Sequence, residues 1–317
     1  MWRDGDGLRA AHAATGDLRS WSDAQGRDVA DHVTGLIDRI ATPVPSFAGI
    51  ALARPCLMGV VNVTPDSFSD GGDAFDAGDA VSRGRALAEA GAAIIDVGGE
   101  STRPGSDAVS EAVELRRVES VVGALAAAGH VVSIDTRRAV VMRAALAAGA
   151  KIVNDVTALT GDADSIDVVA RSGAAVVLMH MQGEPKTMQA APTYRFAPLD
   201  IYDYLADRIA VCEAAGITRD RIAIDPGIGF GKTLEHNLQI LDMLGLFRGL
   251  GCAVLLGVSR KSFIAKLSGE GDAKSRLPGS IAAGLAGIAR GVHILRVHDV
   301  AETLQALTVW QAIGARR

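Results

Sequence analysis

The chain has 317 residues, of which 49% are hydrophobic and 22% charged, and its formal net charge is -5 at pH 7. This is the composition of a globular protein with one large domain or two small ones. No run of Lys and Arg interleaved with aromatic residues occurs, so we expect no nucleic-acid partner. The three cysteines are far apart and form no C-x-x-C pair, which argues against a disulfide framework or a zinc site.

The N-terminal region carries no sign of a secretion signal or a membrane anchor. Its first residues lack an apolar core, and no apolar run anywhere approaches the roughly 20 residues that a membrane span requires. We therefore expect a cytoplasmic protein with no membrane partner. Residues 1–45 show weak patterning, which predicts a weakly structured N-terminal extension, either a short appended helix or a disordered tail.

From residue 46 to 317 the sequence repeats one pattern: an alanine-rich helical segment, a glycine, and a short β-branched run. The glycines stand where a left-handed residue ends a helix, at Gly91, Gly129, Gly149, Gly173, Gly216, Gly251 and Gly291. Seven helix-to-strand turns imply eight strands, which we predict at 56–63, 93–97, 130–134, 151–153, 174–179, 221–224, 252–258 and 292–297. The runs are mostly continuous and apolar, as in strands buried on both faces.

Alternating strands and helices predict a parallel sheet, either open or closed. Eight units over about 260 residues match the closed (β/α)8 TIM barrel. We predict one such barrel over residues 46–317 and no second domain.

Polar residues follow every predicted strand, at the end where the active sites of such barrels lie. They are Asn62, Asp96, Asp135, Asn154, His180, Asp225, Ser259 to Lys261, and Arg296 with His298. Any one of them has a simpler interpretation as a satisfied core group or a helix cap. Their occurrence on all eight strands predicts a single site.

The polar set divides by charge. The acceptors Asp135, Asn154 and Asp225 suit a flat heterocycle with adjacent N–H donors. The cations Arg103, Lys261, Arg296 and His298 suit phosphoryl oxygens. We therefore expect a ring at one end of the cavity and an anion at the other, under two polar lid loops at 62–76 and 98–110.

The segment "IDPGIGFGKT" at 224–233 ends like a phosphate-binding loop. However, Pro226 has no N–H where a Walker A loop needs a glycine, so this is not a nucleotide-binding loop of that kind. The glycines alternate as G-x-G-x-G, whereas a dinucleotide-binding turn needs G-x-G-x-x-G. Lys232 is interpreted as a solvent-facing residue at a helix start. His180 is interpreted as a core residue and not a metal ligand, and Met179 as a wall of the pocket.

Eight segments together resemble dihydropteroate synthase, the folate-biosynthesis enzyme that joins a pterin to 4-aminobenzoate. In chain order they are "MGVVNVTPDSFSDGG" (58–72), "DVGGESTRPG" (96–105), "SIDT" (133–136), "NDV" (154–156), "LMHMQGEPKTMQ" (178–189), "DPGIGFGKT" (225–233), "GVSRKSF" (257–263) and "RVHDV" (296–300). They cover the chain from about residue 50 to its end, in the order found in the family.

The resemblance implies roles for individual residues. Asp135, Asn154, Asp225 and Lys261 would bind the pterin, with Met179 beside it. Thr102, Arg103, Arg296, His298 and Asn62 would hold the diphosphate, Asn62 through Mg²⁺. Phe68, Pro104, Phe230 and Ser262 would line the 4-aminobenzoate pocket, and Asp70 would lie near the nascent cation. Asp70, Arg103, Lys261, Arg296 and His298 would form the catalytic set.

The implied reaction is displacement of diphosphate from 6-hydroxymethyl-7,8-dihydropterin pyrophosphate by the nitrogen of 4-aminobenzoate. It requires stabilisation of the leaving anion and no covalent nucleophile. The resemblance further implies a homodimer and a sulfonamide target. Two alternatives remain: a pterin-dependent methyltransferase, and a catalytically silent pterin-binding paralogue.

Overall fold

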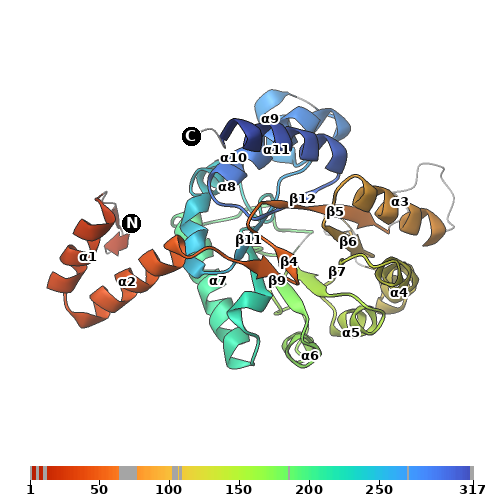
Figure 1. The fold of residues 1–317 in the computed structure, drawn as a ribbon, viewed down its shortest axis with the longest axis horizontal. Helices are drawn as coiled ribbons and strands as arrows, with labels where there is room; N and C mark the ends of the chain where they lie inside the picture. The colour runs from red at the N-terminus through yellow and green to blue at the C-terminus, as the bar shows by residue number, and fades with distance from the viewer. Residues whose placement is uncertain are drawn as a thin grey trace.

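Eight parallel strands close into a barrel at the centre of the molecule (Figure 1). The computed structural model describes residues 2–4, 7–9, 13–63, 77–101, 106, 109–184, 186–269 and 271–314. The barrel strands are β5 (Cys56–Asn62), β6 (Ile94–Gly98), β7 (Val132–Asp135), β8 (Ile152–Asp155), β9 (Ala175–Met179), β10 (Ile222–Asp225), β11 (Ala253–Gly257) and β12 (Ile294–Val297). Because β12 pairs with β5, the sheet has no free edge, and the predicted TIM barrel is confirmed.

Helices surround the barrel and connect its strands (Figure 1). They are α3 (Ala77–Glu89), α4 (Glu111–Ala127), α5 (Ala139–Ala147), α6 (Ser165–Ser172), α7 (Ala197–Ala214), α8 (Leu234–Asp242), α9 (Ser262–Ser268), α10 (Leu277–Ala289) and α11 (Val300–Gly314). The described residues also contain the short 3₁₀ segments η2 (Arg219–Arg221), η3 (Leu244–Leu250) and η4 (Lys274–Arg276). None of the described helices combines the length and the apolarity needed to cross a bilayer.

The predicted helix-ending glycines have the expected backbone conformation. All seven have a positive φ, from 71° at Gly251 to 113° at Gly149. At the end of α4, the Gly129 N–H donates to Ala126 and the His130 N–H donates to Leu125, which satisfies the last carbonyls of the helix. His130 therefore belongs to the helix end, and β7 begins two residues after the predicted start.

Side chains along each strand alternate between the barrel interior and the layer under the helices. Met58, Ile94 and Ile152 pack with other inward-facing residues in one buried cluster. Their neighbours Leu57 and Ile95 join the larger cluster between the sheet and the helices. This two-residue period decides which residues point inward at the carboxyl ends of the strands.

A hairpin of β3 (Ser46–Phe47) and β4 (Ile50–Ala51) packs on the barrel at the amino ends of the strands. The Phe47 side chain is only 1% exposed and belongs to the interior cluster. Ala48 and Gly49 both have positive φ, as a two-residue hairpin turn requires. The hairpin thus fills one end of the barrel with apolar groups.

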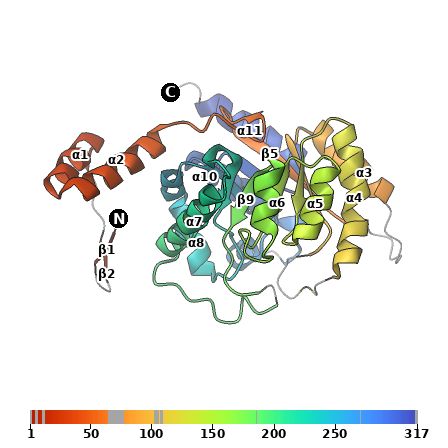
Figure 2. The same ribbon diagram turned by 90° about the horizontal axis from the view of Figure 1, so that it is seen from below.

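The region before the barrel contains β1 (Trp2–Asp4), β2 (Gly7–Arg9), α1 (Thr15–Ala24) and α2 (Arg27–Ala41). Two helices thus lie where the sequence indicated a short helix or a disordered tail. Figure 2 shows α1 and the start of α2 projecting away from the barrel. The end of α2 is attached to η3, because Arg39 Nε donates to the Gly249 carbonyl at 2.6 Å and Arg248 donates to the Ile40 carbonyl at 2.8 Å.

We expect Arg39→Ala to detach the end of α2 from η3. The Gly249 carbonyl would lose its donor, which should cost about 1 kcal/mol of unfolding free energy. Urea denaturation measures the loss of unfolding free energy, and limited proteolysis of the 27–41 segment measures the detachment of α2. Arg27→Ala is the control, since the Arg27 side chain is 92% exposed; equal behaviour of the two variants would contradict the attachment.

Candidate active site

The strand period of two brings polar side chains into the barrel interior at the carboxyl ends. Asp96 stands two residues after the inward-facing Ile94, and Arg296 stands two residues after Ile294. Strand register places Asp135 opposite Asn154. The closed sheet therefore gathers side chains that lie up to 200 positions apart in the sequence.

Arg296 joins two carboxylates from neighbouring strands. Its Nε donates to Asp96 Oδ2 at 2.6 Å, and one terminal nitrogen donates to Asp135 Oδ2 at 2.7 Å. Asp96 is fully buried, and the side chains of Asp135 and Arg296 are 12% and 23% exposed. Charge-assisted bonds at this depth are strong because little water competes for them.

Asn154 extends the cluster. Its Nδ2 donates to Asp96 Oδ2 at 3.1 Å, which fixes the amide orientation and leaves the Asn154 carbonyl oxygen directed elsewhere. Within the described residues, the buried Asp96 Oδ1 has no hydrogen-bond partner. Sequence reasoning noted Asp96 at a strand end but gave it no role, whereas the structure makes it the acceptor shared by two strands.

Asp225 and Lys261 form the other half of the site. The Gly227 N–H donates to Asp225 Oδ1 at 2.7 Å, which holds the 6%-exposed carboxylate in place. Lys261 Nζ donates to the Ile228 carbonyl and lies 4.2 Å from the centre of the Phe230 ring. The turn after β10 thus contacts both the acid and the base.

Burial and charge together shift the pKa of these groups. Burial raises the pKa of Asp135 to about 7, although Arg296 opposes the shift. Burial also raises the pKa of Asp225 and lowers the pKa of Lys261 to about 8, with Asp225 opposing the latter. For Arg296, burial lowers the pKa, but Asp96 and Asp135 outweigh it and the net pKa is above the ordinary value. Perturbed groups gathered in this way are typical of an active site.

His298 lies at the end of β12, next to Ser259. Its Nδ1 is 3.0 Å from Ser259 Oγ, and its backbone N–H donates to the same oxygen at 3.2 Å. The neighbouring Arg260 has a positive φ of 61° and pairs with Asp299, with Nε to Oδ2 at 2.9 Å. Arg260 is therefore engaged in a structural ion pair, and its backbone N–H donates to Ser280 Oγ at 2.8 Å.

The other predicted residues lie around this mouth. Met179 is buried at the end of β9, and Phe230 is half-buried beside Lys261. Ser262 is exposed at the first position of α9. Asn62 is half-buried at the end of β5.

Some predicted residues lie outside the part of the chain that the structure describes. They are Phe68, Asp70, Thr102, Arg103 and Pro104. Most of the two predicted lid loops, 62–76 and 98–110, lies there as well.

Two sequence interpretations need correction. The expected spatial separation of acceptors and cations does not hold for Arg296, because its guanidinium pairs directly with Asp96 and Asp135. The role of Arg296 in binding the diphosphate stays a prediction. The assignment of Lys232 to the solvent was also wrong. Its side chain is 2% exposed and bonds to His180 and to the Phe230 carbonyl. His180 is buried as expected for a core residue.

A second buried network begins at Thr136, next to Asp135 in the chain, and the sequence did not predict it. Thr136 Oγ1 donates to Glu114 Oε1 at 2.6 Å, and Arg138 pairs with Glu114 at 2.8 Å and with Glu100 at 3.2 Å. Burial raises the pKa of Glu114. The network joins α4 and the segments after β6 and β7. Its members are far apart in the sequence and form no recognisable motif, so no local pattern predicted that they interact.

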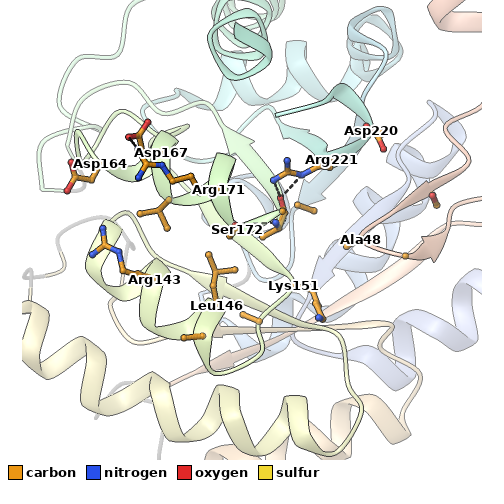
Figure 3. Close-up of a pocket in the computed structure, with 18 residues that line it drawn as sticks. Ala48, Arg143, Leu146, Lys151, Asp164, Asp167, Arg171, Ser172, Asp220 and Arg221 are labelled. Atoms are coloured by element: carbon orange, nitrogen blue, oxygen red, sulfur yellow. Dashed lines mark hydrogen bonds and ion pairs between the residues drawn. The ribbon is translucent and has the colours of Figure 1, made fainter. Parts of the chain in front are cut away.

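A cavity of about 920 Å³ lies at the amino ends of the strands, away from this cluster (Figure 3). Two of its arginines are engaged with the protein. Arg221 donates to the carbonyls of Ala174 and Val169, and Arg171 pairs with Asp167 at 3.1 Å. The perturbed acids and bases at the carboxyl ends therefore define the candidate active site.

A closed (β/α)8 barrel with interacting acids and bases at the carboxyl ends of its strands defines a TIM-barrel enzyme. Residues 58–298 match the family model described as "Pterin binding enzyme". Dihydropteroate synthase of Neisseria meningitidis serogroup C is 49% identical over 269 residues, which are 84% of this chain and 95% of that protein. This chain belongs to the dihydropteroate synthase family, whose members are transferases of folate biosynthesis.

Two solved structures support the same conclusion. Xanthomonas albilineans dihydropteroate synthase with 4-aminobenzoic acid is 48% identical, with a TM-score of 0.80, and the match covers 84% of this chain and 95% of that one. The same enzyme in complex with 7,8-dihydropteroate is 45% identical with a TM-score of 0.76, covering 84% and 96%. The resemblance indicated by the sequence motifs is therefore confirmed.

We expect Asp135 to make stability depend on pH. With a folded pKa of about 7 against an ordinary 3.8, the folded protein binds more protons than the unfolded chain between these values. Stability should therefore fall as pH rises through this range. Asp135→Asn removes the effect, so the stability of wild type minus that of the variant should decrease from about pH 4 to pH 7.

Urea denaturation at a series of pH values measures this difference. Asp167→Asn serves as the control because the Asp167 side chain is 68% exposed. A difference between wild type and Asp135→Asn that stays constant with pH would contradict the assignment.

Proposed function

We propose that this chain condenses 6-hydroxymethyl-7,8-dihydropterin pyrophosphate with 4-aminobenzoate to give 7,8-dihydropteroate and pyrophosphate. The observation that carries the proposal is the meeting of Asp96, Asp135, Asn154, Asp225, Lys261 and Arg296 at the mouth of one barrel. Relatives solved with 4-aminobenzoic acid and with 7,8-dihydropteroate support the choice of substrates.

The pterin ring is held by the acceptors. Asp225 uses Oδ1 for the Gly227 N–H, and its Oδ2, which makes no hydrogen bond within the described residues, accepts from the amino edge of the ring. Asn154 offers its carbonyl oxygen because Asp96 takes its N–H. Lys261 donates to the oxo or N5 side of the ring. Met179 packs against the ring face.

The diphosphate is held by His298 and Arg296, together with Thr102 and Arg103. Asn62 fits a Mg²⁺ ion, because its amide makes no side-chain hydrogen bond within the described residues and lies at the interior end of β5. No three His, Cys, Asp or Glu among the described residues form a metal cage. Mg²⁺ keeps several waters and takes substrate phosphates as ligands, so one amide oxygen is consistent with such an ion.

The 4-aminobenzoate lies over Phe230 and near Ser262, with Phe68 and Pro104 as further walls. Sulfonamides would compete for this pocket, since they imitate the arylamine. Asp70, which lies outside the described residues, would stabilise the positive charge that develops on the methylene carbon.

The reaction breaks the bond from the methylene carbon to the diphosphate oxygen and forms a bond from that carbon to the arylamine nitrogen. The nitrogen then loses a proton to the solvent or to the released diphosphate. Bound at Asn62, Mg²⁺ would stabilise the charge of the leaving diphosphate. Arg296 and His298 stabilise the same anion, and Asp225 and Lys261 orient the ring for attack.

We also propose a homodimer and a cytoplasmic location. The C-terminal helix α11 exposes Val309, Trp310 and Ile313, at 56%, 37% and 66%, beside the small-residue helix α10. Such an apolar face favours association with a second copy. The cysteines Cys56, Cys212 and Cys252 are free thiols, which is compatible with a reducing compartment.

Pyrophosphate release tests the proposed function. We expect rapid release from the dihydropterin pyrophosphate with 4-aminobenzoate and Mg²⁺ present, formation of 7,8-dihydropteroate, and loss of both on excess EDTA. A methyltransferase or a silent paralogue would release none under any of these conditions, and that result would reject the synthase.

Asp225→Asn should weaken pterin binding. The substitution replaces an acceptor oxygen by a donor that faces the donors of the ring, so the Kd for 6-hydroxymethylpterin should rise more than tenfold. Isothermal titration measures it, with Asp242→Asn on the exposed end of α8 as the control. An unchanged Kd in a folded variant would show that the ring binds elsewhere.

A further inference from the structure

Lys232 is a fully buried lysine that the reaction described above does not use. Its side chain is 2% exposed, and its Nζ lies 3.0 Å from His180 Nδ1. The same nitrogen donates to the His180 carbonyl at 3.2 Å and to the Phe230 carbonyl at 2.9 Å. No carboxylate pairs with it among the described residues. Burial lowers the pKa of Lys232 well below its ordinary value, and the three surrounding acceptors match the three N–H bonds of its ammonium form.

His180 is fixed as the partner of Lys232. Burial, followed by the charge of Lys232, lowers the pKa of His180 to about 2, so its imidazole is neutral. In the tautomer that carries its hydrogen on Nε2, the Nδ1 atom accepts from Lys232. The ring packs edge-on against Tyr204 with centroids 4.9 Å apart, and Tyr194 lies 5.9 Å away. The acceptor for Lys232 therefore has a defined position and does not titrate at neutral pH.

The turn between β10 and α8 is held at four successive carbonyls, each by a different side chain. Lys261 donates to Ile228, Gln189 to Gly229, Lys232 to Phe230, and Tyr194 to Gly231. A turn held at every carbonyl has little freedom to move. Lys232 is the donor that reaches it from the buried side.

The turn also packs with backbone against backbone on the end of β9. A Cβ at Gly227 would lie 1.9 Å from the His180 carbonyl oxygen, and one at Gly231 would lie 2.3 Å from the Gln182 carbonyl oxygen. Only glycine permits this approach. The Lys232 ammonium bonds to carbonyls on both sides of the contact, His180 on the strand end and Phe230 on the turn.

The opposite face of the same turn forms part of the pterin site. Its Gly227 N–H holds Asp225, its Ile228 carbonyl holds Lys261, and its Phe230 ring lies against the Lys261 ammonium. A shift of the turn would therefore move Asp225 and Lys261 together. Arg296, on β12, is held by Asp96 and Asp135 and not by a carbonyl of this turn.

We propose that Lys232 is a positioning residue for pterin recognition, which ties the 227–231 turn to the end of β9 and so fixes Asp225 and Lys261. This role rests on the pterin site proposed above. It accounts for a lysine in the "GFGK" segment of a protein that lacks a phosphate-binding loop. Lys232 itself does not touch the substrate.

Lys232→Met tests the role, since methionine fills the same apolar channel and donates no hydrogen bond. We expect the Kd for 6-hydroxymethylpterin to rise about tenfold and the Kd for inorganic pyrophosphate to stay within about twofold of wild type. Lys266→Met, at an exposed position of α9, is the control and should change neither constant.

A second comparison separates positioning from stability. Met142→Ala removes a buried side chain between α5 and the barrel, far from the turn in the fold, and should destabilise the protein without changing either Kd. If Lys232→Met does not fold, His180→Phe takes its place, because it keeps the aromatic packing and removes the Nδ1 acceptor. An unchanged pterin Kd in the folded variant, or an equal loss for pterin and pyrophosphate, would overturn the role.

The outcome for wild type separates the two proposals. If wild type binds hydroxymethylpterin and the folded Lys232→Met variant binds it equally well, only the role of Lys232 fails. If wild type binds no pterin, the proposed function fails first and the role of Lys232 fails with it.

Discussion

The site depends on one interaction, the guanidinium of Arg296 held between the carboxylates of Asp96 and Asp135. Three charges at this depth are tolerable only as partners, because each alone would cost several kcal/mol of desolvation. The pairing requires β12 to lie beside β5, so that Arg296 reaches Asp96 on β6 and Asp135 on β7, and it therefore forms only when the sheet closes. Barrel closure and site assembly are therefore the same event, and the charges favour the one register in which they meet.

The fold was predictable because its signals are local. Glycines such as Gly91 and Gly149 stand where a positive φ ends a helix, and apolar runs mark strands covered on both faces. The alternation of side chains along each strand then predicted which strand-end residues point into the barrel, since Asp225 and Arg296 follow inward-facing residues. Local patterns do not show pairing across the barrel, which is why Arg296 was grouped with the anion-binding cations and not with its two carboxylates.

Lys232 shows why the remainder escaped prediction. A lysine before a helix is usually exposed, and nothing beside it in sequence indicates otherwise. Its burial depends on His180, which lies 52 residues earlier, and on the close approach of two backbone segments. Asp96 and the Glu114 network are similar cases: each looks like an ordinary strand or helix residue until the barrel supplies its partners. The resemblance to a family supplied roles for the substrate contacts and none for these supporting groups.

The balance of charge around the ring explains why the diphosphate needs help from elsewhere. Within the described residues, the carboxylates of Asp96 and Asp135 are paired with Arg296, and Asp225 interacts with Lys261. Burial raises the pKa of Asp135 and Asp225 and lowers the pKa of Lys261, which reduces the charge that the cluster carries. A neutral pterin can bind there without burying net charge, which limits the desolvation cost. A diphosphate meets Arg296 only as a cation that two carboxylates already share, so Arg296 alone does not offset the diphosphate charge. The remaining charge needs further cationic groups, and this requirement is the physical argument for the proposed roles of His298, of a cation at Asn62 and of Arg103, which lies outside the described residues.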